Sequence, residues 1–354
     1  MVARMLDIPT KSAEAVLAIL SMPGIGPRLA RRVLEEWSTV EQVVSASFED
    51  LKRLGVERVA ERLRDIEAWD AAITAGNQQL YRASTLQIKV ATVWDAGYPP
   101  YLARIEDHPL LMYIRGNLQA DGRTVACIGT REPSTFGVRV ARDVSAYLAS
   151  NGWSIVSGLD IGIDTLAHES ALVEKGHTVA VLANGLDTVY PKSNMALADQ
   201  ILESGGALVS EQPIGTPIIP RNLVQRDRLQ SGMSLGTVVM QTDVKGGSMH
   251  TVRFTLTQGR LLFAPSPPSS ARNDPKSQGI AALTEKTGRE LANLVSASPD
   301  YHRLLVGTFG NQPPAKAIAH RTEYREIINL LESAHEAQIN PREGNPRQMR
   351  LFPM

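Results

Sequence analysis

The chain has 354 residues, of which 43% are apolar, and this length accommodates two or three domains with a sizeable core. It lacks an apolar run of about 18 residues and a charged-then-apolar leader, which argues against a membrane span and a secretory signal. Its single cysteine, Cys127, excludes a disulfide framework or a cysteine-rich zinc site and favours a cytoplasmic location. Basic and acidic residues number 37 each, so the formal net charge of zero argues against a strongly basic DNA coat protein while allowing a local basic stripe.

Residues 1–75 are predicted to form an all-helical domain. Around Gly24 and Gly26, an apolar segment leads through a glycine-x-glycine turn into a helix pattern, which resembles a helix-hairpin-helix. Such a turn lets backbone amides approach a DNA phosphate, but it also serves as a plain helix connector, and both readings stay open. A weaker second copy has Gly55, but Glu57 replaces the second glycine and would repel phosphate, so we interpret this copy as structural. The segment carries 10 basic and 12 acidic residues and offers phosphate no net attraction.

Residues 76–120 are predicted to be a connector that packs on the core through a proline-bounded edge strand. From residue 121 to 296, apolar runs alternate with helix-period segments. Strands are expected at 124–129, 154–157, 178–183, 206–210, 236–241 and 260–264, with helices in the gaps and a last helix at 283–294. Apolar runs separated by helices are typical of a parallel sheet covered on both faces, so the pattern predicts an α/β, doubly wound, Rossmann-like domain. Its binding crevice is expected at the carboxyl ends of the strands.

The remaining residues, 297–354, are predicted to be a short helical and irregular tail. We expect 299–320 to be irregular and 322–335 to be helical. The stretch from residue 339 onward is rich in proline, arginine and glutamine, and is predicted to be disordered.

Two strand–glycine-rich turn–helix units carry the most informative motifs. Residues 129–137 read GTREPSTFG, and residues 157–168 read SGLDIGIDTLAH. These resemble the GSR-x-P-S-x-x-G and S-G-x-A-x-G-I-D-x-x-A-H motifs of the DNA-processing protein A (DprA/Smf) family. Further matches occur at 178–191 and 210–215, and the family's R-N-R run corresponds to Arg226, Asp227 and Arg228. The resemblance covers roughly residues 90–285. Many members end in a winged helix, and we do not recognise the pattern of one in this sequence.

The resemblance implies a site for phosphate or DNA at the glycine-rich turns and nearby cations. The expected contacts are Gly129, Thr130, Arg131, Ser134, Gly137, Ser157, Gly158, Gly162, Lys192, Arg226, Arg228, Gly246, Gly247 and Ser248.

Several of these residues have a plainer alternative. Arg131 is favoured as a phosphate contact over a surface ion pair, whereas Lys192 is equally well explained as a solvated helix-start lysine. Asp227 replaces the family's asparagine, and a carboxylate between two arginines would weaken the phosphate site. Asp164 and His168 share one helix face, but one aspartate and one histidine make a poor metal site. We interpret Asp164 as a cap-like residue and His168 as a hydrogen-bonded core group.

The sequence has no nucleophile elbow, Walker A motif, HExxH or kinase set, and nothing in it calls for a cofactor or a metal. The resemblance therefore implies a non-enzymatic, homodimeric protein that binds single-stranded DNA and loads a RecA-type recombinase during transformation or recombination. The alternative is a nucleotide-sensing or nucleotide-processing protein on the same fold, in phage defence. Steep salt dependence of oligonucleotide binding, unaffected by free nucleotides, separates the two hypotheses.

The last residues resemble the Q-L-x-L-F peptide through which bacterial replication proteins hold the sliding clamp. Leu351 and Phe352 would fill an apolar pocket, and Gln348 would hydrogen-bond at its rim. Because five-residue matches arise by chance, an uninteresting tail or a segment packed on its own core is an equal alternative.

Overall fold

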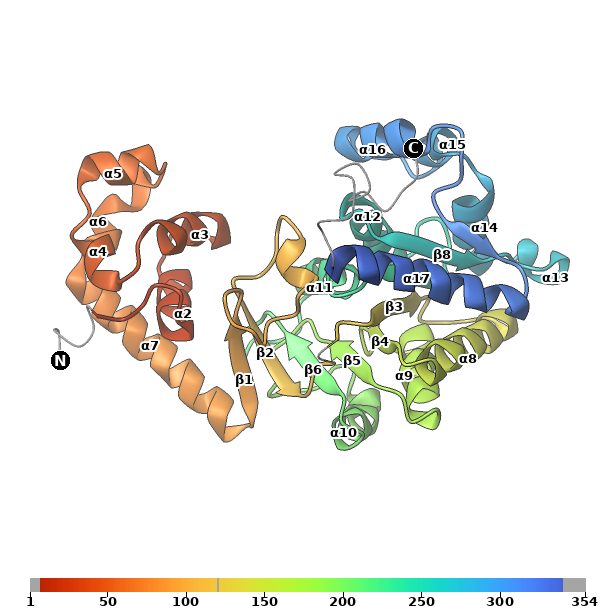
Figure 1. Cartoon of the computed structure of the whole chain (residues 1–354), viewed down its shortest axis with the longest axis horizontal. Helices are drawn as coiled ribbons and strands as arrows, with labels where there is room; N and C mark the ends of the chain where they lie inside the picture. The colour runs from red at the N-terminus through yellow and green to blue at the C-terminus, as the bar shows by residue number, and fades with distance from the viewer. Residues whose placement is uncertain (1–6, 120, 340–354) are drawn as a thin grey trace.

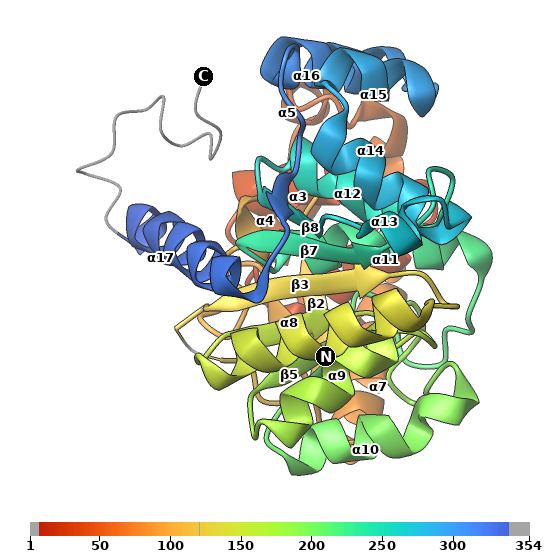
Figure 2. The same cartoon turned by 90° about the vertical axis from the view of Figure 1, so that its right-hand side faces the viewer.

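The computed structural model describes residues 7–119 and 121–339. In this part of the chain, an N-terminal group of helices leads into a nine-stranded sheet with helices on both faces (Figure 1, Figure 2). Among the described residues, no helix combines the length and apolar character that a membrane crossing requires. The residues of the predicted clamp peptide lie outside the described part.

The N-terminal helices begin where the sequence supplies caps. Ser12 accepts a hydrogen bond from the backbone of Ala15 and starts the first of them, while Asp65 caps the longest. This longest helix runs ten residues past position 75, where the sequence placed the end of the helical segment, and leads directly to the first strand. The helices are α2 (Ala13–Ser21), α3 (Pro27–Glu36), α4 (Val40–Val44), α5 (Phe48–Arg53), α6 (Ala60–Leu63) and α7 (Ile66–Thr85).

Both glycine turns of this region have left-handed backbone. Gly24 has φ +83° and Gly55 has φ +72°, a conformation that side chains disfavour. Gly26 is the N-cap of α3, and no atom within 4 Å would obstruct an added Cβ, so this turn is open on its outer side. Glu57 begins the short 3₁₀ helix η1 (Glu57–Val59), and Arg62 donates a hydrogen bond to the Pro23 carbonyl. The second glycine turn and its helix thus contact and stabilise the first turn, in keeping with a structural role.

The sheet has the strand order β1-β2-β6-β5-β4-β3-β7-β8-β9. β3 pairs in parallel with both β4 and β7, while β1 pairs with β2 and β2 with β6 in antiparallel fashion. The doubly wound Rossmann-like prediction is confirmed, with the core strands close to their predicted positions. The predicted edge strand corresponds to β2, which lies second from the edge. The strands are β1 (Ile88–Thr92), β2 (Leu111–Gly116), β3 (Thr124–Gly129), β4 (Ser154–Ser157), β5 (Thr178–Val181), β6 (Ala207–Ser210), β7 (Gly236–Gln241), β8 (Leu261–Pro265) and β9 (Lys316–Ile318).

Alternate residues of β3 face the two helical layers. Val125 and Cys127 pack in an apolar cluster with α8 and α9, whereas Ile128 belongs to a cluster with α12 and α14. Cys127 is completely buried, as its reading as a small hydrophobe requires. The core helices are α8 (Thr135–Ser150), α9 (Ile163–Val173), α10 (Met195–Glu203), α11 (Pro220–Gly232), α12 (Ser248–Thr257), α13 (Ser269–Arg272), α14 (Gln278–Glu285) and α15 (Gly288–Leu294). The single helix expected at 283–294 is two helices, because Thr287 and Glu290 form a capping box that starts α15.

The segment expected to be irregular, 299–320, contains α16 (Pro299–Phe309) and the ninth strand, so that prediction is wrong. Tyr301, Leu305 and Phe309 recur at helical spacing and are buried. β9 pairs in parallel with β8, although its three residues are too few to show a strand pattern in the sequence. The predicted helix at 322–335 is α17 (Tyr324–Ile339), where the Tyr324 ring packs edge-on against Tyr147 of α8 at 5.5 Å between centroids.

Candidate functional site

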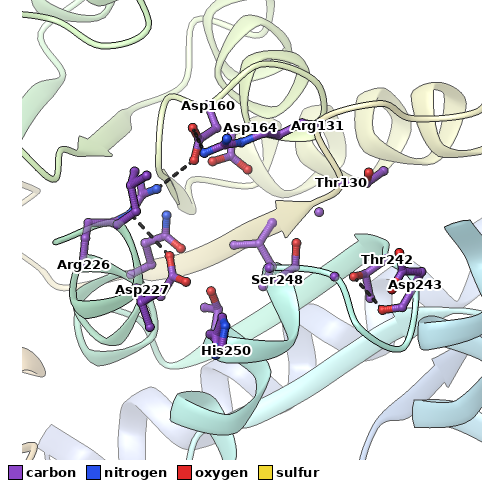
Figure 3. Close-up of a pocket in the computed structure, with 18 residues that line it drawn as sticks. Thr130, Arg131, Asp160, Asp164, Arg226, Asp227, Thr242, Asp243, Ser248 and His250 are labelled. Carbon is purple, nitrogen blue, oxygen red and sulfur yellow. Dashed lines mark hydrogen bonds and ion pairs between the residues drawn. The ribbon is translucent and has the colours of Figure 1, made fainter. Parts of the chain in front are cut away.

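A cavity of about 400 Å³ opens where β3, β4 and β7 end, at the carboxyl edge of the sheet (Figure 3). Its walls are the turns after these strands, the side of α11 and the first turn of α12. The sequence expected the crevice at this edge, because the turns after parallel strands face the same side. Seven predicted contacts line it: Gly129, Thr130, Arg131, Arg226, Gly246, Gly247 and Ser248.

Arg131 follows the end of β3 and carries the accessible guanidinium of the cavity. Its side chain is 50% exposed, and one of its nitrogens lies 2.7 Å from an oxygen of Asp160. The strand end that presents it is closely packed, since an added Cβ at Gly129 would lie 2.5 Å from Ile163. Arg131 is therefore exposed enough to contact a phosphate, but it already forms the ion pair that was the alternative interpretation.

Arg226 is buried and already engaged. Its Nη1 donates to the carbonyls of Gly158 and Val181, both at 2.7 Å, and its Nη2 donates to Asp160 at 2.8 Å. A looser ion pair joins its Nε to Asp227 at 3.4 Å. In this arrangement Arg226 links α11 to the ends of β4 and β5, and its two terminal nitrogens are not available for a bidentate contact to a phosphate.

Arg228 lies outside the cavity. It forms ion pairs with Glu211 at 2.6 Å and Asp107 at 3.2 Å. Residues two apart on a helix point in nearly opposite directions, so Arg226 and Arg228 cannot both face one crevice from α11.

Carboxylates offset the positive charge of the cavity. Asp160, Asp164, Asp227 and Asp243 all line it. Burial raises the pKa of Asp227 to about 7, although Arg226 opposes the shift. Burial, together with the charge of Asp160, also raises the pKa of Asp164. Two arginines thus face four carboxylates in the cavity, so it is not a strongly cationic groove.

The turn before α12 supplies neutral anion donors. The N–H groups of Gly247 and Ser248 make no hydrogen bond within the described residues, and Gly247, the N-cap, carries no side chain that could accept one. Open amides at a helix start are suited to an oxyanion, and the helix dipole adds to their attraction. Figure 3 shows Ser248 facing the cavity across from Thr130.

Other predicted contacts build the turns without lining the cavity. Ser134 caps α8 by accepting from Gly137, while Ser157 donates to the Cys127 carbonyl. Gly162 has φ +85° and approaches the backbone of residues 130 and 131, where an added Cβ would clash. Gly158 donates to Asp164 at 3.0 Å. Lys192 is exposed at the start of the 3₁₀ helix η3 (Lys192–Asn194), outside the cavity lining.

The Asp164 and His168 pair is structural. His168 is completely buried and shares a hydrogen bond of 2.7 Å with Thr178, which confirms its reading as a core group. Burial lowers the pKa of His168 to about 3, so its ring is neutral at physiological pH. The N-cap of α9 is Gly162; Asp164 instead lies in the first turn and holds the preceding loop. Among the described residues, no group of three or more His, Cys, Asp or Glu side chains is arranged to hold a metal ion.

Three ionisable residues of the cavity escaped the sequence analysis, namely Asp160, Asp243 and His250. Asp160 had a signal, because it stands where the quoted family motif has alanine. The other two follow β7 and begin α12, at the carboxyl edge that the fold prediction had already marked. Burial lowers the pKa of His250, so this side chain adds no positive charge at neutral pH.

Comparison with known proteins identifies the kind of chain that carries this site. Residues 16–65 match the SAM-like helix-hairpin-helix tandem. Protein Smf of Escherichia coli strain K12 is 42% identical over 168 residues, which are 47% of this chain and 45% of that protein. The chain spans about half the length of the curated relatives it matches.

Solved structures give the same picture. DNA processing protein A (DprA) from Streptococcus pneumoniae superposes with a TM-score of 0.63 at 27% identity, over 78% of this chain and 93% of that one. The Helicobacter pylori protein, described for its single-stranded DNA binding mode, shares the fold with a TM-score of 0.54 at 24% identity, over 70% of this chain and 96% of that one. Residues 89–300, more than half of the chain, match the DNA recombination-mediator protein A family, and the chain therefore belongs to this family.

Proposed function

We propose that the protein binds single-stranded DNA at the carboxyl edge of its sheet. The observation that carries this proposal is the convergence of Arg131 with the open amides of Gly247 and Ser248 on one cavity. A guanidinium and two amides match the oxygens of a phosphate. Family membership supports the proposal, as does the single-stranded DNA binding described for the Helicobacter pylori relative.

The proposed activity is binding rather than catalysis. Asp164 and His168, which the sequence suggested as an acid–base pair, are buried and hydrogen-bonded to other groups. Asp164 accepts from the backbone N–H of Gly158, and His168 shares a hydrogen bond with Thr178. The described residues that line the cavity include no Phe, Tyr or Trp to stack bases, so phosphate contacts are expected to dominate and sequence preference to be small. The open turn at Gly26 is a candidate accessory contact to the DNA backbone.

The proposal extends to partners that the family name suggests. We propose that a homodimer of this chain protects single strands and passes them to a RecA-type recombinase. The support is the family's description as recombination mediators. The predicted clamp peptide, with Gln348, Leu351 and Phe352, remains a proposed second contact to replication machinery on the strength of its sequence alone.

Arg131→Ala tests the proposal. A labelled oligo-dT strand and a duplex of equal length are titrated at two salt concentrations. Loss of one charge-assisted phosphate contact, made by a half-exposed side chain, should weaken binding of the single strand about tenfold. Arg142→Ala is the matched control, because Arg142 is an exposed arginine of α8 that does not line the cavity. Unchanged affinity of Arg131→Ala at low salt would show that the strand binds elsewhere.

The nucleotide alternative has one observation in its favour. The cavity is bounded by α11 and α12 and lined by carboxylates, which can accept hydrogen bonds from the hydroxyl and amino groups of a nucleoside, while Arg131 would take its phosphate. Free nucleotides added to the oligo-dT titration decide between the two. Displacement of the strand by a mononucleotide at micromolar concentration would favour the nucleotide site.

A further inference from the structure

Asp160 occupies an unusual position between the two arginines of the cavity. Its Oδ1 lies 2.7 Å from Nη2 of Arg131, and its Oδ2 lies 2.8 Å from Nη2 of Arg226. The carboxylate is only 16% exposed, so neighbouring atoms hold it at this place. Figure 3 shows the carboxylate of Asp160 pointing between the two guanidinium groups.

The two arginines respond differently to an incoming anion. Arg226 is 4% exposed and bonded to two carbonyls besides Asp160, so it cannot turn toward a ligand without breaking these bonds. Arg131 is half exposed, and among the described residues its ion pair is with Asp160. A phosphate that enters the cavity therefore meets a guanidinium whose binding edge already faces a carboxylate.

We propose that Asp160 is a specificity-determining residue that competes with phosphate for Arg131. This inference rests on the proposed DNA-binding function of the cavity. In the empty site Asp160 holds Arg131, and in the occupied site Arg131 turns to the phosphate while Asp160 keeps its bond to Arg226. An isolated anion gains little from this exchange, because one ion pair replaces another. A strand that also reaches the amides of Gly247 and Ser248 gains the additional bonds that make the exchange favourable.

The proposal predicts the effect of releasing Arg131. Asp160→Asn keeps an oxygen that accepts from Arg226 but removes the charge that holds Arg131. Single-stranded DNA should then bind about fivefold more tightly, as expected for removal of a partly exposed ion pair. The salt dependence should steepen by about 0.7 in the slope of log affinity against log salt, because Arg131 now exchanges a counterion rather than a carboxylate for the phosphate.

A double-mutant cycle separates this competition from a general loss of negative charge. The gain from Asp160→Asn should disappear when Arg131 is already alanine. Glu132→Gln is the matched control, since Glu132 neighbours Arg131 in sequence, is 81% exposed and pairs with Lys276 at 3.6 Å rather than with Arg131. An equal gain from Glu132→Gln, or a gain from Asp160→Asn that survives in the Arg131→Ala background, would overturn the proposal.

The remaining outcomes are also decisive. If the unaltered protein binds the strand and Asp160→Asn binds it equally or more weakly, Asp160 does not compete and the inference is wrong. If neither protein binds, the proposed function itself fails. Thermal unfolding of each variant shows whether the fold is intact. Should Asp160→Asn be unstable, Asp160→Glu gives a second measurement. This variant retains the charge, so its slope of log affinity against log salt is expected to match that of the unaltered protein.

Discussion

Replacement of Arg226 by methionine separates a structural arginine from a DNA contact. The change keeps much of the side-chain volume but removes every donor. The carbonyls of Gly158 and Val181 lose their bonds to α11, and Asp160 and Asp227 lose their buried cation. Loss of one partner from a buried ion pair costs about 3–5 kcal/mol of unfolding free energy.

Two features of the site set where in this range the cost should fall. Asp160 keeps Arg131 as a partner, and Asp227 can take up a proton because its pKa is already raised to about 7. Both limit the penalty, so we expect about 3 kcal/mol, which lowers the Tm by about 4 °C for a protein of 354 residues.

The assay is urea unfolding followed by tryptophan fluorescence, to which the fully buried Trp153 of the core contributes. Arg228→Met is the matched control, because Arg228 lies two residues away on the same helix and pairs with Glu211 and Asp107 outside the cavity. We expect Arg228→Met to cost less than Arg226→Met, because Arg228 is 14% exposed against 4% for Arg226 and its partner Asp107 is 52% exposed. A stable Arg226→Met variant with weakened DNA binding would show that Arg226 is a phosphate ligand, and the structural reading would be wrong.

Three further predictions concern the cavity and the tail. The raised pKa of Asp227 means that the folded state binds more protons than the unfolded one between the ordinary value of 3.8 and about 7, so stability falls as pH rises through this interval. Asp227→Asn should therefore make the pH dependence of the Tm shallower and leave DNA binding equal or stronger; clearly weaker binding by the stable variant would mean that Asp227 positions a DNA contact. At Gly158, an added Cβ would lie 1.8 Å from Nη1 of Arg226, so Gly158→Ala should lower the Tm by several degrees in calorimetry, and an unchanged Tm would contradict the closeness of this packing. Leu351→Ala with Phe352→Ala should abolish retention on an immobilised sliding clamp without changing DNA affinity, and an intact chain that shows no retention would exclude the clamp contact.

The fold could be predicted where the sequence repeats a strong signal. Residues 178–181, Thr-Val-Ala-Val, are buried on both faces, and such apolar runs between helix patterns indicate parallel strands. The signal fails at β9, whose three residues become a strand only because β8 offers an open edge. It fails again at α16, because Gly310, Pro313 and Pro314 indicated an irregular segment although the residues just before them form a regular helix.

The location of the site could be predicted from the sequence, but the ion pairs within it could not. Glycine turns after strands indicated the carboxyl edge, and seven of the expected contacts line the cavity there. The pairing of Asp160 with both Arg131 and Arg226 depends on how three loops fold together, which spacing does not reveal. The separation of Arg226 from Arg228 was available from helical periodicity, since the same sequence pattern predicted the helix that carries them.

The two outer strands decide how copies of this chain can meet. β1 and β9 are the edges of the sheet, and an exposed edge is a template for pairing with another chain and for aggregation. Here β1 lies beside α7 and has an exposed lysine, Lys89, while β9 is only three residues long and its Lys316 is joined to Glu326 of α17 at 2.8 Å (Figure 1). Short, charged edges resist strand addition. The proposed homodimer would therefore use helical surfaces rather than strand edges, and fibril growth by sheet extension is disfavoured at both ends.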